Sequence, residues 1–307
     1  MVSLGSNLRI QSTPKVHCSR LSSSFTKALY PISGHHLASL RYHRSNVPCH
    51  GLLNRVRQPG ANSRLNVSCS ATDKIIPEGS VSIVLLAGGV GKRMGASIPK
   101  QCLELRGKPI ATYSLETFCG MPCVGEVVVV CEPEWRYVFE ECHKNLGSNK
   151  PLKFALPGAE RQDSVCNGLL GISSSADLVA IHDSARPLVT VEDTMNCILD
   201  AQEVGAAVLG VPVKPTIKEA DAAGMVVKTL VRSVLWEVQT PQVIEPKMLM
   251  EGFELVKKDN LEVTDDVSII EAMGKPVRIT KGCYTNIKVT TPEDLVNAEA
   301  FLDQKTA

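Results

Sequence analysis

The sequence predicts an α/β protein with a Rossmann-like, mostly parallel sheet flanked by helices, and with an extended β-hairpin arm. From about residue 78 to residue 307, short continuous apolar runs alternate with longer amphipathic stretches, which is typical of buried parallel strands joined by helices. Residues 214–232 break this alternation, because two half-polar segments flank the turn-forming residues 221–224. An isolated hairpin cannot bury its own side chains, so we expect the arm to pack on its own domain or on a partner.

The elements are predicted from apolar periodicity and from start signals. The predicted strands are residues 81–87, 126–131, 152–156, 178–182, 206–213 and 277–280. The predicted helices are residues 110–119, 133–144, 161–171, 191–203, 246–257, 265–273 and from 292 onward. Thr264 is the expected N-cap of the helix at 265–273, and Thr291 before Pro292 marks the start of the last helix. Strands that alternate with helices imply right-handed crossovers, and such sheets bind ligands at the carboxyl ends of their strands.

The first 72 residues differ in composition from the rest of the chain. They hold nine Lys and Arg, thirteen Ser and no Asp or Glu, whereas the remainder has 24 basic and 32 acidic residues. A basic, Ser-rich segment without a sustained apolar core is typical of an organellar transit peptide, and the alternative is a disordered basic tail. We predict a largely disordered transit peptide at 1–76, cleaved between Asn66 and Pro77, and one folded domain at 77–307 that includes the arm at 213–233.

Composition also argues against several classes of function. No apolar run reaches the ~18 residues that a membrane span requires, so we expect no membrane association. The acidic balance after residue 72 argues against nucleic-acid binding. The eight cysteines after the leader are scattered singly, without a CxxC pair or a Cys/His cluster, so we expect free thiols in a reducing compartment and neither zinc ligands nor disulfides.

Residues 82–101 have the pattern of a strand that delivers its carboxyl end to an anion. The apolar run Ile83–Leu86 ends at the small residues Ala87–Gly89, and Lys92, Arg93 and Lys100 then add positive charge. Small residues let successive backbone N–H groups converge on phosphate oxygens. The alternative is a glycine turn with incidental surface lysines.

Two familiar phosphate-binding motifs do not fit this stretch. A P-loop has Ser or Thr directly after its Gly-Lys pair, and another Gly five residues before the Gly of that pair. Here Arg93 follows Gly91-Lys92, and the residue five before Gly91 is Leu86. A dinucleotide-binding loop has a third glycine three residues after its second glycine. Here Gly89 and Gly91 would be the first two glycines, but the next one, Gly95, comes one residue too late, and Pro99 would interrupt the helix that should follow. The stretch therefore predicts a different kind of phosphate site.

A second informative stretch, residues 182–187, follows a buried strand. Asp183 lies at the end of a strand, where ligands of such sheets bind. A carboxylate near a polyphosphate is expected to bind a metal ion or to accept hydrogen bonds from hydroxyls or cationic side chains. The alternatives are that Asp183 caps a turn or forms an ion pair with Arg186, which would have little energetic value at the surface. His182 is expected to be a packed strand residue and not a base, because neighbouring side chains in a strand alternate between faces.

Six motifs, in one order along the chain, carry a resemblance to a known family. They are AGGVGKRMG at 87–95, PKQ at 99–101, GAERQDSV at 158–165, HDSARP at 182–187, TPQ at 240–242 and NIKVTTPEDL at 286–295. Together they resemble the 2-C-methyl-D-erythritol 4-phosphate cytidylyltransferases of the non-mevalonate isoprenoid pathway. The resemblance covers residues 81–302, and the leader suits a plastid enzyme of a plant.

The resemblance implies transfer of CMP from CTP to 2-C-methyl-D-erythritol 4-phosphate, giving 4-diphosphocytidyl-2-C-methyl-D-erythritol and pyrophosphate. In such an in-line displacement, catalysis is mostly positioning and charge neutralisation, so Lys and Arg are the expected catalytic residues. By similarity, Arg93 and Lys100 hold the triphosphate, and Lys288 reaches the α-phosphate from the opposite side. Asp183 belongs to the same catalytic set. Mg²⁺ is expected to be carried on the triphosphate oxygens, because the sequence offers no carboxylate cage.

The resemblance also implies binding residues and a partner. Contacts with the nucleotide are expected from Ala87, Gly88, Gly89, Gly158, Ser164 and Ser184. Contacts with the acceptor are expected from Asp183, Arg186 and Thr240, and from Thr216 and Arg232 of the arm of a neighbouring subunit. The active enzyme is therefore expected to be a homodimer, located in the chloroplast stroma after cleavage of the leader. Ala159 stands where the family often has an acid, which leaves only a main-chain contact at that position.

Two other functions are compatible with some of these features. The first is a cytidylyltransferase that acts on another polyol phosphate, such as ribitol 5-phosphate, because the base and triphosphate contacts would be shared. The second is a non-catalytic nucleotide-binding regulator with a degraded site. The intact set of Arg93, Lys100, Asp183 and Lys288 argues against the regulator.

Overall fold

The computed structural model describes residues 75–89 and 99–306, without the side chains of Lys100, Lys305 and Thr306. All of these residues lie in one compact unit of the chain, residues 68–307. Residues 1–74 of the predicted transit peptide, and Arg93, lie outside the described residues.

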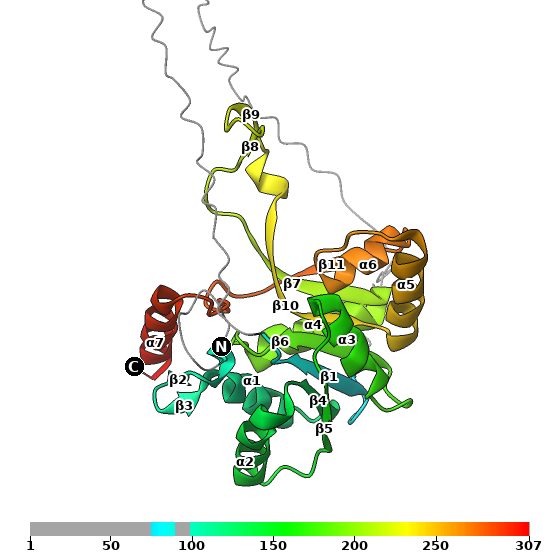
Figure 1. Ribbon diagram of the computed structural model, residues 1–307, viewed down its shortest axis with the longest axis vertical. Helices are drawn as coiled ribbons and strands as arrows, with labels where there is room; N and C mark the ends of the chain where they lie inside the picture. The colour runs from blue at the N-terminus through cyan, green and yellow to red at the C-terminus, as the bar shows by residue number, and fades with distance from the viewer. Residues whose placement is uncertain (1–74, 90–98, 307) are drawn as a thin grey trace, which may run out of the picture. The chain divides into compact units, whose positions relative to one another are not determined.

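A seven-stranded sheet forms the centre of the described part, in the order β11-β7-β10-β6-β1-β4-β5 (Figure 1). Its strands are β1 Val81–Leu86, β4 Val124–Val130, β5 Leu152–Ala155, β6 Leu178–Asp183, β7 Ala206–Pro212, β10 Trp236–Ile244 and β11 Arg278–Lys281. All neighbours in the sheet are parallel except β10, which is antiparallel to both β6 and β7. The predicted fold class, a mostly parallel sheet flanked by helices, is confirmed.

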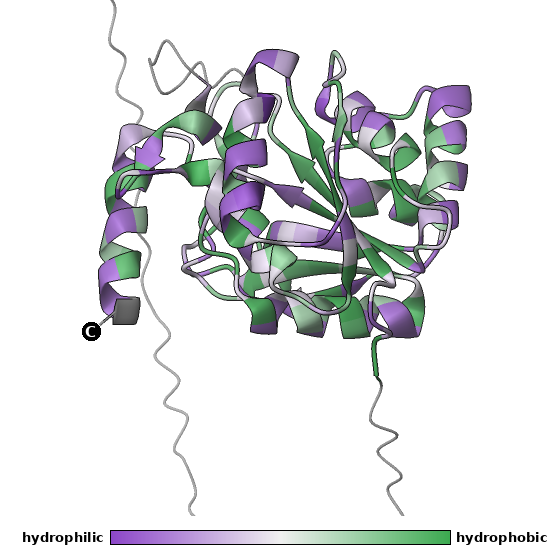
Figure 2. Cartoon of the chain, turned by 90° about the horizontal axis from the view of Figure 1, so that it is seen from below, coloured by the Kyte–Doolittle hydropathy of each residue, from purple (hydrophilic) through white to green (hydrophobic). Residues whose placement is uncertain are grey.

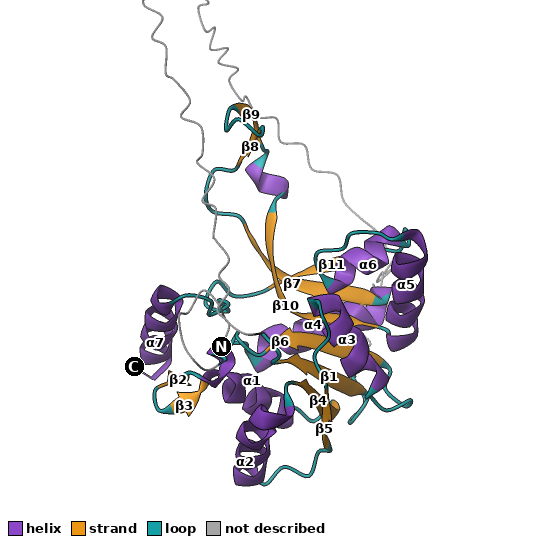
Figure 3. Cartoon of the chain, viewed as in Figure 1, coloured by secondary structure: helices purple, strands orange, loops and turns teal. Residues whose placement is uncertain are grey.

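Helices cover both faces of this sheet (Figure 3). They are α1 Ile110–Cys119, α2 Arg136–Leu146, α3 Arg161–Leu170, α4 Val191–Val204, α5 Pro246–Asp259, α6 Asp266–Ala272 and α7 Pro292–Thr306. Apolar side chains of α1, α2 and α4 belong to the core on one face, and those of α3, α5 and α6 to the core on the other. α7 packs near the short strands β2 Glu104–Leu105 and β3 Lys108–Pro109, where Ala298 and Leu105 share a small third cluster.

The two cores follow from the alternation of side chains along buried strands. In β1, Ile83 and Leu85 point into the core beside α1, α2 and α4, whereas Val84 points into the other core. Because both faces are covered, the strand is apolar at successive positions. Figure 2 shows hydrophobic colour along strands of the sheet. Among the described residues, no helix is long and apolar enough to cross a bilayer.

Strand β10 is an element that apolar patterning did not predict. Its sequence WEVQTPQVI carries two glutamines and a proline, and its register with β7 is interrupted between Val238 and Gln242. Gln242 is nevertheless buried, because both polar atoms of its side chain are hydrogen-bonded to the start of α6. The strand is therefore held by polar contacts that a hydrophobic pattern does not reveal.

The expected cap of α6 is wrong by one residue. Asp265, and not Thr264, is the N-cap, and its Oδ1 accepts a hydrogen bond of 3.1 Å from the N–H of Ser268. The Asp265 N–H in turn donates to the Ser268 hydroxyl over 3.3 Å, which completes a capping box. An Asp carboxylate satisfies the helix start and also suits the positive end of the helix dipole.

The predicted hairpin is confirmed as β8 Lys218–Ala220 paired antiparallel with β9 Val226–Thr229. Figure 1 shows this arm extending from the ends of β7 and β10. Its apolar residues are uncovered: Met225 is 67% exposed, and Val231 is 66% exposed. All eight described cysteines are free thiols, as expected.

Candidate active site

The candidate site lies at the carboxyl ends of β1 and β6, which are neighbours in the sheet. Leu86, the last residue of β1, is in register with Asp183, the last residue of β6. The segments that follow are Ala87–Gly89 and the turn 184–187, and the Ser184 N–H donates to the Leu86 carbonyl over 3.0 Å. The two stretches that the sequence singled out are thus brought together at one edge of the sheet.

The small residues after β1 are required by close backbone packing. The Ala87 N–H donates to the Val130 carbonyl over 2.8 Å, and the side-chain amide of Gln101 donates to the Ala87 carbonyl. A Cβ on Gly88 would lie 2.6 Å from the Cβ of Pro157, so any larger residue would push the β5–α3 loop away. Gly89 is exposed, with open space around it. Residues Ala87–Gly89 therefore form a cradle whose backbone is accessible from the side of Gly89.

Gly158 and Ser164 lie together at the start of α3. The Gly158 N–H donates to the Ser164 hydroxyl over 2.9 Å, and that hydroxyl donates to the Glu160 carbonyl over 3.2 Å. A Cβ on Gly158 would lie 2.1 Å from the Cβ of Asp163, so only glycine fits here. Since Pro157 touches Gly88, the start of α3 and the cradle after β1 form one surface.

Asp183 makes two ion pairs. Lys288 Nζ lies 2.6 Å from Oδ2 of Asp183, and Arg161 Nε lies 3.5 Å from Oδ1. Burial favours the neutral acid, but Arg161, Lys288 and Arg186 outweigh it and hold the pKa of Asp183 well below its usual range. Asp183 is therefore a carboxylate at neutral pH. The alternative that paired it directly with Arg186 is wrong, because Arg161 and Lys288 are its ion-pair partners.

Arg186 points instead toward the loop before α7. Its Nη1 donates to the Asn286 carbonyl over 2.7 Å, while its Nε is buried with no hydrogen-bond partner. Burial lowers the pKa of Arg186 despite the nearby Asp183. Oδ1 of Asn286 is also buried without a partner. Two unpaired polar atoms thus lie at this point of the site, where a bound ligand would supply the missing hydrogen bonds.

His182 is a packed residue, as predicted. Its ring is fully buried and lies edge-on to Phe118, with ring centroids 5.1 Å apart. Nε2 lies 3.2 Å from the Arg186 carbonyl, so it carries the proton, and the Thr240 hydroxyl donates to Nδ1 over 3.1 Å. The same hydroxyl accepts the Asp183 N–H over 3.1 Å. Burial lowers the pKa of His182 to about 4, so the imidazole is neutral and acts as a spacer between β6 and β10.

The other predicted site residues fall into two groups. Lys100 begins the 3-10 helix η2 Lys100–Cys102, next to Gln101, whose side chain contacts the Ala87 cradle, and Ser184 is buried in the turn after β6. Thr216 and Arg232 are exposed at the arm, away from this group, where Arg232 Nη1 donates to the Lys214 carbonyl over 2.8 Å. Their expected contacts with ligands stay predictions.

Sequence reasoning missed one charged pair in the site. Arg161 forms a two-fold hydrogen-bonded ion pair with the buried Asp266, through Nη1 to Oδ1 at 2.8 Å and Nη2 to Oδ2 at 2.9 Å. A signal was present, because an arginine at the first position of a helix is disfavoured by the helix dipole. A cation there needs carboxylate partners, and the structure supplies two of them.

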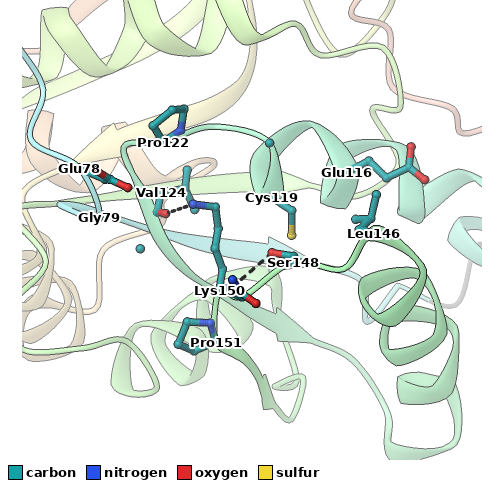
Figure 4. Close-up of a pocket in the computed structure, with 13 residues that line it drawn as sticks. Glu78, Gly79, Glu116, Cys119, Pro122, Val124, Leu146, Ser148, Lys150 and Pro151 are labelled. Carbon is teal, nitrogen blue, oxygen red and sulfur yellow. Dashed lines mark hydrogen bonds between the residues drawn. The ribbon is translucent and has the colours of Figure 1, made fainter.

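No metal cage is found in the described part of the chain, where no three His, Cys, Asp or Glu side chains are grouped to hold an ion. A separate pocket of about 520 Å³, lined by Glu78, Cys119, Val124 and Lys150 among others, lies at the amino ends of β1 and β4 (Figure 4). There the Lys150 ammonium donates to the Val124 carbonyl over 2.7 Å. This pocket is at the opposite edge of the sheet and contains none of the predicted site residues.

A mostly parallel sheet with a small-residue cradle after its first strand and paired cations beyond a neighbouring strand fits a nucleotidyltransferase. Comparison with known proteins then gives the family. Residues 81–304 match the family model "IspD: 2-C-methyl-D-erythritol 4-phosphate cytidylyltransferase", and the chain belongs to this family.

Named relatives agree with the family match. The chain is 60% identical over 235 residues to the chloroplastic 2-C-methyl-D-erythritol 4-phosphate cytidylyltransferase of Oryza sativa subsp. japonica, covering 76% of this chain and 78% of the rice protein. It is 42% identical to the enzyme of that name from Caldanaerobacter subterraneus, covering 73% of this chain and 99% of the relative. The crystal structure of the Thermus thermophilus enzyme superposes with a TM-score of 0.59 at 31% identity, covering 73% of this chain and 99% of that chain.

Proposed function

We propose that this chain transfers CMP from CTP to 2-C-methyl-D-erythritol 4-phosphate, releasing pyrophosphate, in the synthesis of isoprenoid precursors. The observation that carries the proposal is the family match over residues 81–304, with the Ala87–Gly89 cradle and the Asp183–Lys288 pair at neighbouring strand ends. The relatives at 60% and 42% identity bear this activity in their names.

The proposed reaction needs positive charge around one phosphorus atom. The acceptor phosphate attacks the α-phosphorus of CTP in line, the bond to the bridging oxygen breaks, and pyrophosphate leaves with that oxygen's electron pair. Lys288 is suited to the α-phosphate, because its side chain is 38% exposed while Asp183 holds its ammonium in place. Arg93 and Lys100 are proposed to neutralise the leaving pyrophosphate. Preorganised cations lower the barrier because they need not reorient as charge develops.

The nucleotide is proposed to lie over the cradle and the start of α3. Ala87, Gly88 and Gly158 are proposed to contact the base with their backbones, next to the exposed Gly89, where the cradle is open. Ser164 would add a hydroxyl for reading the base, once its present bond to the Glu160 carbonyl is exchanged. CTP would therefore place its base at α3 and its phosphates toward Lys288.

A divalent cation, proposed to be Mg²⁺, would neutralise part of the triphosphate charge when it is bound. The described residues fit an ion that arrives on the nucleotide, because both oxygens of Asp183 already face Arg161 and Lys288. The chain's own task is then to bind and orient the phosphates that carry the ion.

The acceptor is proposed to bind across a homodimer. Asp183, Arg186 and Thr240 would contact it from one subunit, and Thr216 and Arg232 from the arm of the other. The uncovered valines of the arm support this proposal, because large exposed apolar patches mark interaction surfaces. Association would bury them and bring Arg232 to the partner's site.

The experiment that tests this function is a pyrophosphate-release assay on the purified chain, with CTP, UTP, ATP and GTP as donors. Methylerythritol phosphate and ribitol 5-phosphate serve as alternative acceptors. We expect release with CTP and methylerythritol phosphate only. Equal rates with ribitol 5-phosphate would favour the alternative polyol substrate, and CTP binding without release under any condition would favour the regulator.

The leader is proposed to direct the protein to the chloroplast stroma, as the name of the rice relative suggests. Residues 1–76 fused to a fluorescent protein should then accumulate in plastids of plant cells, with the fusion shortened near residues 66–77. Residues 77–307 alone should retain the full rate of pyrophosphate release. Diffuse fluorescence in the cytosol would contradict the predicted localisation.

A further inference from the structure

Arg161 lies within the motif at residues 158–165 but has no part in the reaction as proposed above. It is the first residue of α3, directly after the loop that carries Gly158. Its side chain is 33% exposed, yet all three guanidinium nitrogens face carboxylate oxygens. Such complete pairing within one site calls for a specific role.

Asp266 fixes the outer edge of the guanidinium. This side chain is only 1% exposed, and both its oxygens accept from Arg161 in the parallel geometry that arginine and carboxylate prefer. The main chain at Asp266 is fixed as well, because its N–H and that of Val267 donate to Gln242 Oε1 over 2.9 Å and 3.0 Å. Asp266 is thus a rigid anchor supplied by α6 and β10.

The inner edge of the same guanidinium faces the catalytic group. Arg161 Nε lies 3.5 Å from Oδ1 of Asp183, an ion-pair distance longer than a good hydrogen bond. The other oxygen of Asp183 lies 2.6 Å from Lys288 Nζ. Asp266, Arg161, Asp183 and Lys288 therefore form an alternating row of charges that joins α6, α3, β6 and the loop before α7.

We propose that Arg161 is a positioning residue: anchored by Asp266, it fixes the carboxylate of Asp183, which in turn sets the place from which Lys288 reaches the reacting phosphate. This role rests on the proposed function for the identity of the reaction. A lysine cannot replace it fully, because one ammonium group cannot grip both oxygens of Asp266 and still face Asp183.

Electrostatics gives the proposal a measurable consequence. The groups that face Asp183 are Arg161 from α3, Lys288 from the loop before α7, Arg186 and His182 from β6 and its turn, and the like-charged Asp266 from α6. Burial favours the neutral form of Asp183, so the cations alone keep its pKa low. Without Arg161, the pKa of Asp183 rises, because burial then meets less opposing positive charge.

The test uses the full-length chain with Arg161→Gln, which removes the charge, and Arg161→Lys, which keeps it. Arg278→Gln is the matched control, because Arg278 is also paired with two acids, Asp200 and Glu203, but on β11. Steady-state kcat and KM are measured from pH 3 to pH 9, because Asp183 titrates at acid pH. In parallel, the Asp183 carboxyl is titrated by carboxyl-carbon NMR on aspartate-labelled protein and assigned by its absence in Asp183→Asn.

We expect Arg161→Gln to lower kcat about 10- to 100-fold, as when a group that orients a catalytic residue is removed. The acid limb of kcat and the Asp183 titration should both move to higher pH, by less in Arg161→Lys than in Arg161→Gln. Arg278→Gln should match the wild type. In the Asp183→Asn background, adding Arg161→Gln should lower kcat by less than a further factor of about two, because Arg161 acts through Asp183.

A loss of kcat with an unchanged pH profile and an unchanged Asp183 titration would overturn the proposal and leave Arg161 a purely structural residue. Fully additive losses in the double variant would overturn it as well. If the wild type transfers no CMP to methylerythritol phosphate, the proposed function fails, but the Asp183 titration in folded Arg161→Gln still decides whether Arg161 controls this carboxyl. If Arg161→Gln does not fold, Arg161→Lys supplies both readouts.

Discussion

Lys288 and Asp183 form an ion pair of 2.6 Å although they are 105 positions apart in the sequence. The loop that carries Lys288 is attached to the turn after β6, because the Val289 N–H donates to the Ala185 carbonyl over 2.8 Å. Val289 is completely buried, so the lysine next to it has little freedom in its backbone. The pair therefore presents a partly exposed ammonium at a defined place, which is what a transition-state cation requires.

Lys288→Ala should lower kcat for pyrophosphate release by about 100-fold or more, the scale seen when one preorganised donor is removed. The matched control is Lys281→Ala, which removes an exposed lysine at the end of β11 and should leave the rate unchanged. Steady-state kinetics with CTP and methylerythritol phosphate measures both. A Lys288→Ala variant with wild-type kcat would mean that the ammonium only stabilises Asp183.

Lys100→Ala should also cost two or more orders of magnitude in CTP-dependent pyrophosphate release, because the family resemblance places this lysine at the triphosphate. Lys144→Ala, an exposed lysine in the last turn of α2, is the control for loss of one surface charge. An unchanged rate in Lys100→Ala would show that the assignment of this residue is wrong.

Gly88→Ala tests the contact between the cradle and the β5–α3 loop. The added Cβ would stand 2.6 Å from the Cβ of Pro157, so the loop must shift at a cost of about 1–3 kcal/mol. We expect a lower Tm and a higher KM for CTP. Gly120→Ala is the control, since its Cβ would meet neighbours at an ordinary 3.5 Å. Equal Tm values for the two variants would contradict the packing argument.

The burial of His182 should make the free energy of unfolding depend on pH. Its pKa is about 4 in the folded chain, below the ordinary 6.5, because the ring is buried and neutral. The unfolded chain therefore binds more protons between these values, so stability is complete above pH 6.5 and falls as the pH drops toward 4. The shift corresponds to about 3 kcal/mol. Urea unfolding at pH 7 and pH 5 should show about 2 kcal/mol of this loss, because the loss continues down to pH 4, and the difference should be smaller in His182→Gln.

Much of this fold was predictable because its strands are buried on both faces. A run such as Ile83–Leu86, bounded by small residues, fits few structures besides a buried strand. The position of Asp183 at the end of a similar run placed it in a site by the geometry of parallel sheets alone. β10 was not predictable in the same way. Gln242 is buried in it only because the N–H groups of α6 are within reach, and no local pattern records that contact.

The same limit applies to the charged row in the site. The pairing of Arg161 with Asp266 depends on the amino ends of α3 and α6 being neighbours, which is a property of the topology and not of either helix. Lys288 was predicted only through the family resemblance, because a lysine in a loop belongs to no helical or strand pattern that would indicate its position. Long-range ion pairs are therefore the part of this site that required the structure.

Arg232→Ala tests the role of the arm. If the arm reaches a partner's acceptor site, the variant should raise the KM for methylerythritol phosphate more than the KM for CTP, because the guanidinium would contact only the acceptor. Val231→Asp, which places a charge on the uncovered face beside it, should instead convert a dimer to monomers in light scattering. Val296→Asp is the matched control, because Val296 is similarly exposed, at 65%, but lies on α7. Equal increases of both KM values in Arg232→Ala, or a dimer that survives Val231→Asp, would count against an arm that completes the neighbouring site.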